Sequence, residues 1–569
     1  MSFLLYNSFN IMEVGLPLFG YKITEKQLLI AILLLGALLR FWGLGSAEIF
    51  HDEGFYAFRS IGYFDYIQND AQTTPVQWPA VSLPNGSLPF WTSLSFHDHP
   101  PLFFLIQHLF FSIFGDSLLV ARLLSFLAGI GAIYLAYLIG KKLSKNELVG
   151  ILAAALLSVN HIHIWISRSS IFESLLTFLI FLNIYYFLSF LENLERWKMF
   201  GITLGLAFLT KYTGFFLVPV YFFYLLIYRR EIFKSRYLYA SLLITLLLFT
   251  PVIIYNFYLY QVTGHFDLQF SYLFRQATPE WQASLGKIQE PFSNMVENLL
   301  AMYSIPFLLV VLSGMAYSCI ILFRDFRVNP RIDQRKSAIL FGWLTFLFIT
   351  LILIPVGSAF RFIALYLFPF MFFSVTAILF LSGKFPKKIF FPALAVFLAY
   401  ELYFSIGGIF LEFPNFGVAR LDRYLEAEID GKRPLRLPES PNPHLDAVIK
   451  KYGRPLPTVD ESLVIVYDEN IALSSKLWLF TRRLYYRGIL TVTAGQFKTL
   501  LQNQGMEAFN NSRIYFVKAT ENTSLNPNFT TKDAEELEYF LRTQLNLNPA
   551  EKIYGYNNLL MFTIYEFKL

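Results

Sequence analysis

Apolar runs that are long enough to cross a membrane recur through most of this sequence. Of the 569 residues, 55% are hydrophobic and only 15% are charged, whereas soluble domains carry roughly 25% charged residues. Because about 20 helical residues span the hydrocarbon core of a bilayer, uncharged runs of this length predict transmembrane helices. The sequence therefore predicts a mainly α-helical, polytopic membrane protein. The apolar runs fall at 26–45, 100–115, 117–140, 148–166, 170–191, 197–210, 213–228, 237–260, 297–323, 337–356, 362–382 and 389–412.

The basic residues predict which side of the membrane each loop faces. Lys and Arg concentrate in cytoplasmic loops, and six basic clusters can all be cytoplasmic only if one early run does not cross. The run at 100–115 is short and begins with Pro-Pro, so we interpret it as a re-entrant or interfacial helix. About eleven crossings remain, which places the N-terminus in the cytoplasm and residues 413–569 outside it, in a multi-pass plasma-membrane protein. The clusters are Lys22/Lys26, Lys141/Lys142/Lys145, Arg196/Lys198, Arg229/Arg230/Lys234/Arg236, Arg324/Arg327/Arg331/Arg335/Lys336 and Lys384/Lys387/Lys388.

The composition also excludes two kinds of function. The net charge of +6 does not indicate nucleic-acid binding, because the basic residues form short clusters between apolar runs. The single cysteine, Cys319, excludes an internal disulfide and a cysteine-based metal site.

This topology leaves few charged side chains outside the cytoplasm, and ionisable groups near membrane depth usually mark function. The carboxylates can act as a general base or bind a metal ion. The cations can hold an anion, and arginine offers a fork of donors that suits phosphate. A carboxylate beside a bound phosphate ester indicates transfer of a group from a lipid-phosphate carrier. The set comprises Asp52, Glu53 and Arg59 in "FHDEGFYAFRS", Asp98 and His99 in "FHDHPPL", Arg168 and Glu173 in "ISRSSIFESLL", Lys211 in "LTKYTG", Arg275, and Arg361 in "GSAFRF".

Most of these residues also have a purely structural interpretation. Asp52 can cap the helix that follows it, with Glu53 complementing the dipole of the first turn. Arg361 can extend from a helix end to the membrane surface, and Lys211 can be an ordinary loop residue between two short helices. Glu173 lies inside an apolar run, where a purely structural role is harder to justify.

The order of the motifs resembles that of a family of membrane enzymes. "FHDEGFYAFRS", "HDHPPLFFLIQHLFFSIFGDSLLVARLLSFLAG", "SRSSIFESLLTFLIFLNIYYF", "GLAFLTKYTGFFLVPV" and "AFRFIALYLFPF" follow one another on the same predicted face. Together they resemble the GT-C superfamily of integral-membrane glycosyltransferases. The nearest likeness is to the branch with the protein O-mannosyltransferases and the lipid A aminoarabinose transferase, and it covers roughly residues 26 to 400.

The resemblance implies a polyprenyl-phosphate sugar as donor, an extracytoplasmic active site and inversion at the anomeric carbon. It makes Asp52 the candidate catalytic base, with Glu53 as the second member of the acidic pair. It also implies that Asp98 and Glu173 hold a divalent metal ion if the enzyme uses one, although the aminoarabinose branch has Lys where His99 stands.

The remaining residues are predicted to bind the substrates. In this sequence Phe362 replaces the tyrosine that the family has after the residue matching Arg361, and "LTKYTG" lacks the usual Gly directly after Lys. In the loop 261–296, which aligns poorly, Arg275 is preferred to His265 without a motif to decide between them. The predicted substrate-binding residues are Arg59, His99, Arg168, Lys211, Arg275 and Arg361.

After residue 412 the composition changes to that of a water-exposed domain. Residues 413–460 are rich in Pro and charge and predict a linker with short helices. Beyond them, "SLVIVYD", "ILTVT" and "SRIYFVKA" read as strands that alternate with helical stretches, and "EKIYGYNNLLMFTIYEFKL" reads as a closing hairpin. This alternation predicts a small α/β domain. We therefore expect a transmembrane GT-C catalytic domain at 1–412, with the first extracytoplasmic loop and its juxtamembrane helices at 46–116, and an extracytoplasmic α/β domain at 413–569.

Three functions remain open from the sequence. The leading hypothesis is a glycosyltransferase that moves a single hexosyl or pentosyl group from a polyprenyl-phosphate donor to a protein, lipid or glycan acceptor. The alternative is a flippase or transporter of lipid-linked saccharides, which would favour polar residues at mid-bilayer and repeated halves, and the sequence shows neither. The third is a membrane scaffold whose C-terminal domain binds partners.

Overall fold

The computed structural model describes residues 24–49, 51–65, 89–276, 291–328, 333–411, 415–430, 448, 450–451, 462–505, 509, 512–523, 525, 530 and 532–568. Lys22 and Arg331 of the basic clusters, and most of the predicted linker at 413–460, lie outside the described residues. The chain forms two compact units, each described by itself below. The helical unit comprises Met1–Trp42, His97–Phe103 and Arg122–Glu412, and the mixed unit comprises Gly43–Phe96, Phe104–Ala121 and Phe413–Leu569.

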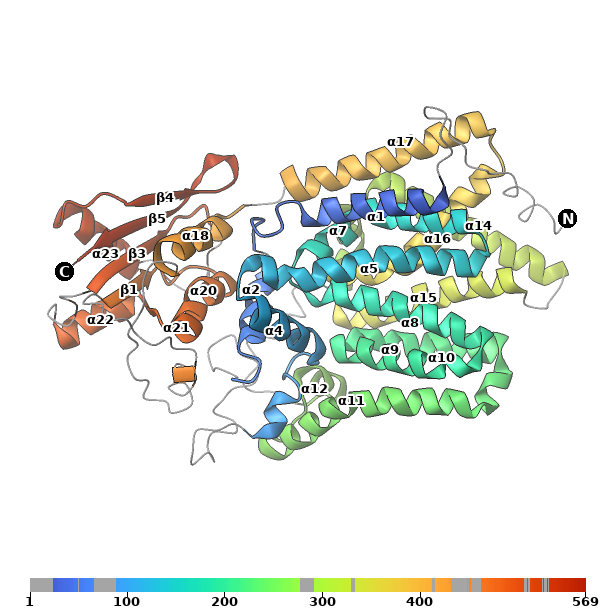
Figure 1. The fold of residues 1–569 in the computed structure, drawn as a ribbon, viewed down its shortest axis with the longest axis horizontal. Coiled ribbons are helices and arrows are strands. Elements are labelled where there is room, and N and C mark those ends of the chain that lie inside the picture. The colour runs from blue at the N-terminus through green and yellow to red at the C-terminus, as the bar shows by residue number, and fades with distance from the viewer. Residues whose placement is uncertain are drawn as a thin grey trace. The chain divides into compact units, whose positions relative to one another are not determined.

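Long antiparallel helices build the helical unit (Figure 1). Seven described helices are long and apolar enough to cross a membrane, or eight if α6 and α7, which are bent by 62° at their junction, count as one span. The other predicted crossings fall on the shorter helices α1, α9 and α10. The helices are α1 (Glu25–Phe41), α5 (Leu118–Ser144), α6 (Glu147–Val159), α7 (His161–Arg168), α8 (Phe172–Glu192), α9 (Trp197–Thr210), α10 (Leu217–Tyr228), α11 (Arg236–Thr263), α12 (Leu268–Phe274), α13 (Met295–Met302), α14 (Ile305–Val328), α15 (Gln334–Val356), α16 (Leu367–Ser382) and α17 (Lys387–Ile406).

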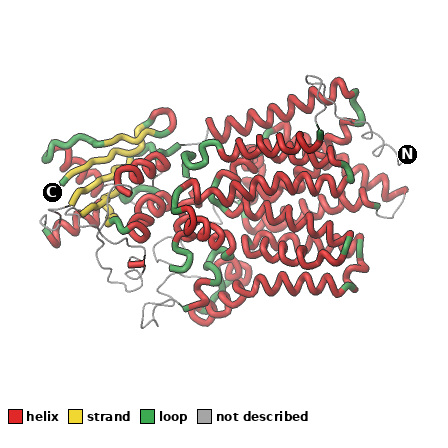
Figure 2. The backbone as a smooth tube through the Cα atoms, viewed as in Figure 1, coloured by secondary structure: helices red, strands yellow, loops and turns green. Residues whose placement is uncertain are grey.

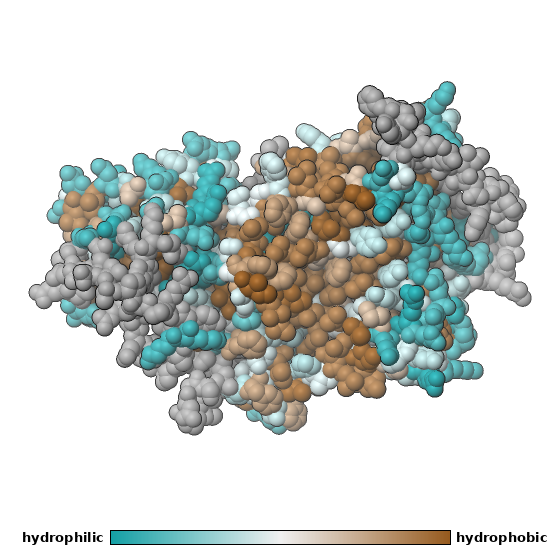
Figure 3. Space-filling model, viewed as in Figure 1, coloured by the Kyte–Doolittle hydropathy of each residue, from teal (hydrophilic) through white to brown (hydrophobic). Residues whose placement is uncertain are grey.

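The surface of these helices confirms the prediction of a mainly helical membrane protein. Figure 3 shows a broad hydrophobic band over the helical unit with hydrophilic residues at its end. Large apolar side chains such as Leu247 and Phe257 of α11 and Val396 of α17 are exposed, which suits contact with lipid. The run predicted not to cross forms α4 (Leu102–Phe114). At 1.5 Å per residue α4 is about 20 Å long, which is less than the roughly 30 Å of the hydrocarbon core.

Alternating helix directions gather the basic turns at one end of the helical unit. The turns α5–α6, α8–α9, α10–α11, α14–α15 and α16–α17 share that end (Figure 1), and they carry the basic clusters of the sequence. The turns α7–α8, α9–α10, α11–α12 and α15–α16 share the opposite end, which we call the site end. The chain therefore has the charge asymmetry that the positive-inside rule describes.

A five-stranded sheet forms the centre of the mixed unit (Figure 2). Its order is β2-β1-β3-β5-β4, with β1 parallel to both β2 and β3, and β5 antiparallel to both β3 and β4. All five strands fall where the sequence predicted strands or the closing hairpin. They are β1 (Ser462–Tyr467), β2 (Leu490–Thr493), β3 (Ser512–Ala519), β4 (Glu551–Tyr554) and β5 (Leu560–Phe567).

Helices cover both faces of this sheet, because successive side chains of a strand point to opposite sides. On β1, Ile465 and Tyr467 face a core with α18 (Val418–Leu425) and the π-helical turn η11 (Leu477–Thr481). Val464 and Val466 face a second core with α22 (Ala494–Gln504) and α23 (Lys532–Thr543). The predicted α/β layer is therefore present.

Part of the predicted first loop belongs to the mixed unit as well, whereas His97–Phe103 belong to the helical unit. Helix α2 (His51–Ile61) of this loop shares a hydrophobic core with part of α4, the start of α5, α18, η11 and α21 (Arg482–Arg487). Helix α2 of the first loop thus packs on C-terminal residues within one compact unit.

Candidate active site

Lys211 and Glu173 form a buried ion pair at the site end of the helical unit. Helix α9 ends at Thr210, and Lys211 follows as its C-cap in extended backbone, whereas Glu173 lies in the first turn of α8. The Lys211 ammonium donates to Glu173 Oε1, and the two residues are only 7% and 3% exposed. Two charges are rarely buried unless each neutralises the other. The sequence placed these residues in different roles, and the structure brings them together.

The second oxygen of Glu173 remains available to a ligand. Among the described residues, Oε2 is buried and has no hydrogen-bond partner. A buried acceptor without a partner costs roughly 1–3 kcal/mol, and a hydroxyl of a bound substrate would satisfy it.

Lys211 and Arg361 share one aromatic ring. Lys211 Nζ lies 4.5 Å from the Phe362 ring centroid, and Arg361 Cζ lies 5.1 Å from the same centroid. Both Arg361 and Phe362 belong to the short helix η8 (Phe360–Tyr366), which precedes α16. The aromatic face stabilises nearby cations, so two positive groups are held close together. We call Glu173, Lys211, Arg361 and Phe362 the cation cluster.

The Asp98–His99 segment reaches the cation cluster through Phe172. The His99 ring stacks on Phe172 with centroids 4.5 Å apart and planes 8° apart, and Phe172 lies 6.0 Å from Lys211 Nζ. Asp98 Oδ2 is 3.0 Å from His99 Nδ1. His99 therefore offers a polar ring beside the ion pair.

The metal site that the resemblance implies, with Asp98 and Glu173 as ligands, stays a prediction. Among the described residues, no group of three or more His, Cys, Asp or Glu side chains is arranged to hold a metal ion. Glu173, one of the two expected ligands, instead bonds the Lys211 ammonium. The cation beside this carboxylate is supplied by the protein.

A buried aspartate anchors the loop that follows α11. Asp267 caps α12 by accepting from Gln269 N and Phe270 N, and its other oxygen accepts from Tyr212 Oη at 2.6 Å and Asn256 Nδ2 at 3.0 Å. Burial raises the pKa of the Asp267 carboxyl to about 6, although these hydrogen bonds act to lower it. Asp267 is one of the charged residues that the predicted topology places outside the cytoplasm, but no motif around it predicts a role.

The anchored loop also supports the Asp98 segment. Leu268 N donates to His97 O at 2.7 Å, and Gln269 Nε2 donates to Asp98 O at 3.1 Å. His265, the alternative to Arg275, has its ring centroid 5.6 Å from that of His97. Arg275 is exposed at the C-cap of α12 with φ of 55°. Of the two candidates in this loop, His265 therefore contacts His97, next to Asp98, whereas Arg275 is exposed.

Arg168 binds the end of another helix. Its Nη1 donates to the carbonyl oxygens of Leu39, Arg40 and Trp42 at 3.1, 3.1 and 2.6 Å. These carbonyls end α1, so Arg168 satisfies acceptors that lack partners within that helix. This contact gives Arg168 a structural role in addition to the predicted one in substrate binding.

The acidic pair lies in the first turn of α2, in the mixed unit. Asp52 is half-buried and Glu53 is 1% exposed, and both positions favour negative charge through the helix dipole. Arg59 lies two turns further along the helix, with its Cζ 5.7 Å from the Phe104 ring centroid. Because α2 begins at His51, Asp52 lies inside the first turn and is not its N-cap residue, whereas the catalytic interpretation is compatible with this position.

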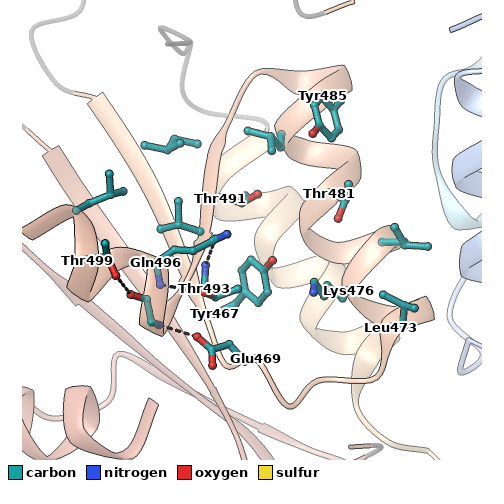
Figure 4. A pocket seen from close by; sticks show the side chains of 16 residues that line it. Tyr467, Glu469, Leu473, Lys476, Thr481, Tyr485, Thr491, Thr493, Gln496 and Thr499 are labelled. Atoms are coloured by element: carbon teal, nitrogen blue, oxygen red, sulfur yellow. Dashed lines mark hydrogen bonds between the residues drawn. The ribbon is translucent and has the colours of Figure 1, made fainter. Parts of the chain in front are cut away.

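The mixed unit also contains an open pocket of about 1040 Å³ beside β2, between η11 with α21 and the start of α22 (Figure 4). Several of its polar side chains serve the local fold. Glu469 accepts from Gly495 N, Gln496 and Thr493 form a capping box, and Thr491 donates to Phe480 O. We therefore assign this pocket no part in the reaction.

Comparison with known proteins identifies the class of this structure. Residues 98–255 match the family described as dolichyl-phosphate-mannose-protein mannosyltransferase, and this stretch holds Asp98, Glu173 and Lys211. The crystal structure of apo ArnT from Cupriavidus metallidurans superposes with a TM-score of 0.50 at 12% identity, over 94% of this chain and 97% of ArnT. The chain therefore has the fold of the GT-C membrane glycosyltransferases, and the predicted resemblance is confirmed.

Further matches accompany these two. ArnT bound to undecaprenyl phosphate gives a TM-score of 0.48 at 12% identity, over the same 94% and 97%. The oligosaccharyltransferase AglB from Archaeoglobus fulgidus, in complex with an inhibitory peptide and dolichol-phosphate, gives 0.46 at 13% identity, over 87% of this chain and 69% of AglB. Two uncharacterized proteins of Aquifex aeolicus (strain VF5) are 32% identical over 146 residues and 29% identical over 230 residues. These matches cover 26% and 39% of this chain, and only 33% and 42% of the two relatives.

Proposed function

We propose that this chain is a glycosyltransferase that moves one sugar from a polyprenyl-phosphate donor to an acceptor hydroxyl outside the cytoplasm. The basic turns mark the cytoplasmic end of the helices, so the site end lies at the extracytoplasmic surface of the plasma membrane. We propose that the C-terminal α/β domain is extracytoplasmic as well, as the count of crossings from the basic clusters predicts.

The cation cluster is the observation that carries this proposal. Lys211 and Arg361 are held on one ring at the end of apolar helices, where a lipid phosphate has its headgroup. Cations at membrane depth are costly and are kept for function. A phosphate ester on a lipid carrier matches this position and charge, and the matched family's description names such a donor.

The reaction then follows from the charges. The acceptor oxygen attacks the anomeric carbon, the bond from that carbon to the phosphate oxygen breaks, and the configuration inverts. Asp52 takes the acceptor's proton as general base, and Glu53 supports it in the first turn of α2. Lys211 and Arg361 stabilise the negative charge that grows on the departing polyprenyl phosphate.

The other polar groups hold the substrates. Glu173 Oε2 accepts a hydroxyl of the bound sugar, and His99 contributes its ring beside Phe172. Arg59, Arg168 and Arg275 complete the predicted set of substrate-binding residues. Arg168 contributes by holding the end of α1, and Arg275 contributes from the exposed end of α12. The transferred group is a hexose or pentose, and the acceptor is a protein, lipid or glycan.

Substitution of the proposed base tests the reaction. We expect Asp52→Asn to reduce transfer by about 10²–10⁴-fold while undecaprenyl phosphate binds within about threefold of wild type. Glu297→Gln, which changes an exposed carboxylate of α13, should have no effect and is the matched control. Transfer by Asp52→Asn at the wild-type rate would remove the proposed base.

A further inference from the structure

Helix α2 has two faces of different composition. Side chains three, four, seven and eight residues apart share one face of a helix. One such face carries Gly54, Ala57, Phe58, Ile61 and, directly after the helix, Gly62. Asp52, Tyr56 and Arg59 lie about 140–160° from Gly54 around the helix axis at 100° per residue, so the proposed base points away from the face that carries Gly54.

The glycine-bearing face packs on C-terminal residues. Ala57, Phe58 and Ile61 share a buried core with Trp478 and Tyr486. The Phe58 and Tyr486 rings are 5.6 Å apart. The C-terminal part of the chain thus supplies the surface against which α2 rests.

Both glycines mark places where this packing leaves no room for a side chain. A methyl group on Gly54 would lie 2.8 Å from the carbonyl carbon of Ser474 and closer still to its oxygen. A methyl group on Gly62 would lie 2.8 Å from Tyr486 Cζ and closer still to its hydroxyl. Helix interiors otherwise favour Ala over Gly, so close approach to a neighbour explains a glycine at position 54.

The segments before and after α2 are tied to the same C-terminal residues. The Glu48 carboxylate accepts from Val418 N at 3.1 Å and Ala419 N at 3.3 Å, at the start of α18. Burial alone would raise the pKa of Asp116, but Arg482 and Arg487 outweigh it and hold that pKa at about 2.

Arg482 in turn connects this contact to the interior of the C-terminal part. Its guanidinium is 2.8 Å from Asp422 Oδ1, and Trp478 Nε1 donates to Asp422 Oδ2 at 2.7 Å. We call the C-terminal surface on which α2 packs, formed by Ser474, Trp478 and Tyr486, the seat of α2. It is a packed surface that ion pairs hold in place.

We infer that Gly54 and Gly62 are positioning residues through which the C-terminal domain sets the rotation of α2 and hence the direction of Asp52. This inference rests on the proposed function, since it assigns Asp52 the role of base. It gives the α/β domain a part in catalysis without contact with substrate.

Glycine substitutions test the seat. We expect Gly54→Ala and Gly62→Ala to lower turnover by about 10–100-fold, because a displacement of about 1 Å can cost that much. Binding of undecaprenyl phosphate should stay within about twofold of wild type. Turnover is measured as undecaprenyl phosphate released from a glycolipid extract of the source membranes. Gly407→Ala, where an added methyl group meets no atom within 4 Å, is the matched control and should match wild type.

A second-site change separates positioning from misfolding. The substitution Tyr486→Leu removes the hydroxyl and ring atoms that a methyl group on residue 62 would meet. We therefore expect Gly62→Ala/Tyr486→Leu to recover turnover to within about threefold of Tyr486→Leu alone. Wild-type turnover in both glycine variants, or no recovery in the double variant, would overturn the inference. Asp52→Asn is assayed in parallel: if it is active, the proposed base fails, whatever the glycine variants show.

Discussion

The buried pair of Lys211 and Glu173 predicts a separation between stability and donor binding. Replacing Lys211 by Met leaves the Glu173 carboxylate buried without its partner. Loss of one partner of a buried ion pair typically costs about 3–5 kcal/mol, and both residues here are less than a tenth exposed. We expect Lys211→Met to lose that much stability, and Lys211→Met/Glu173→Gln to recover most of it, because no uncompensated charge remains.

Donor binding should not recover in the double variant. A charge-assisted hydrogen bond contributes about 1.5–3 kcal/mol, and each 1.4 kcal/mol is a factor of ten in affinity. If Lys211 binds the donor phosphate, the double variant should bind undecaprenyl phosphate about 10–100-fold more weakly than wild type. Thermal unfolding in lipid nanodiscs measures stability, and titration with the lipid measures affinity.

The pair of Lys142 and Glu192 is the matched control. It is an ion pair at the opposite end of the helices, with Glu192 exposed, and exposed pairs contribute about 0–1 kcal/mol. Lys142→Met/Glu192→Gln should therefore change neither quantity. Wild-type affinity for undecaprenyl phosphate in Lys211→Met/Glu173→Gln would refute the phosphate role and leave Lys211 a structural residue.

Three further predictions follow from the site end. Burial raises the pKa of Asp267 from 3.8 to about 6, so its protonated form stabilises the fold. Its contribution, about 3 kcal/mol at 1.4 kcal/mol per unit, should be full below about pH 4 and lost as pH rises through 6. Unfolding at pH 4–7 should show this slope in wild type but not in Asp267→Asn. Because Lys211 supplies the cation beside Glu173, transfer should survive exhaustive chelation; loss that Mg²⁺ or Mn²⁺ restores would contradict this. Arg168→Met should destabilise by about 3 kcal/mol or more, since it removes the donor to three carbonyls of α1, whereas Arg275→Ala should change stability by less than about 0.5 kcal/mol; equal effects in thermal unfolding would count against these assignments.

The fold was largely predictable because its signals are local in the sequence. Apolar runs and alternating strands report burial residue by residue, and the basic turns report the direction of the helices. The bend between α6 and α7 was not predicted, and the run 148–166 was read as one crossing. Asn160 ends α6 and caps α7 by accepting from His163 N, and a single capping residue leaves no trace in a hydropathy pattern.

The sequence predicted most of the residues of the candidate site, but it did not predict which of them contact one another. Glu173 and Lys211 were both selected as costly charges, yet their pairing joins residues 38 positions apart, and no periodicity reports such a contact. Arg168 was selected for the same reason, but its partners are backbone carbonyls of α1, which no motif encodes. The seat of α2 depends on backbone approach at Gly54, which becomes visible only once the C-terminal residues are folded against it.

The central claim is that this chain transfers a sugar from a polyprenyl-phosphate donor. The most direct test is whether the donor is cleaved or moved intact in sealed vesicles. The full chain is reconstituted with a radiolabelled polyprenyl-phosphate sugar from the source membranes and an extract of acceptors. We expect the glycolipid to be cleaved, with one undecaprenyl or other polyprenyl phosphate released for each sugar transferred with inverted configuration. With Asp52→Asn, cleavage should be about 10²–10⁴-fold slower. Movement of the intact glycolipid between leaflets without cleavage would contradict sugar transfer and identify a flippase instead.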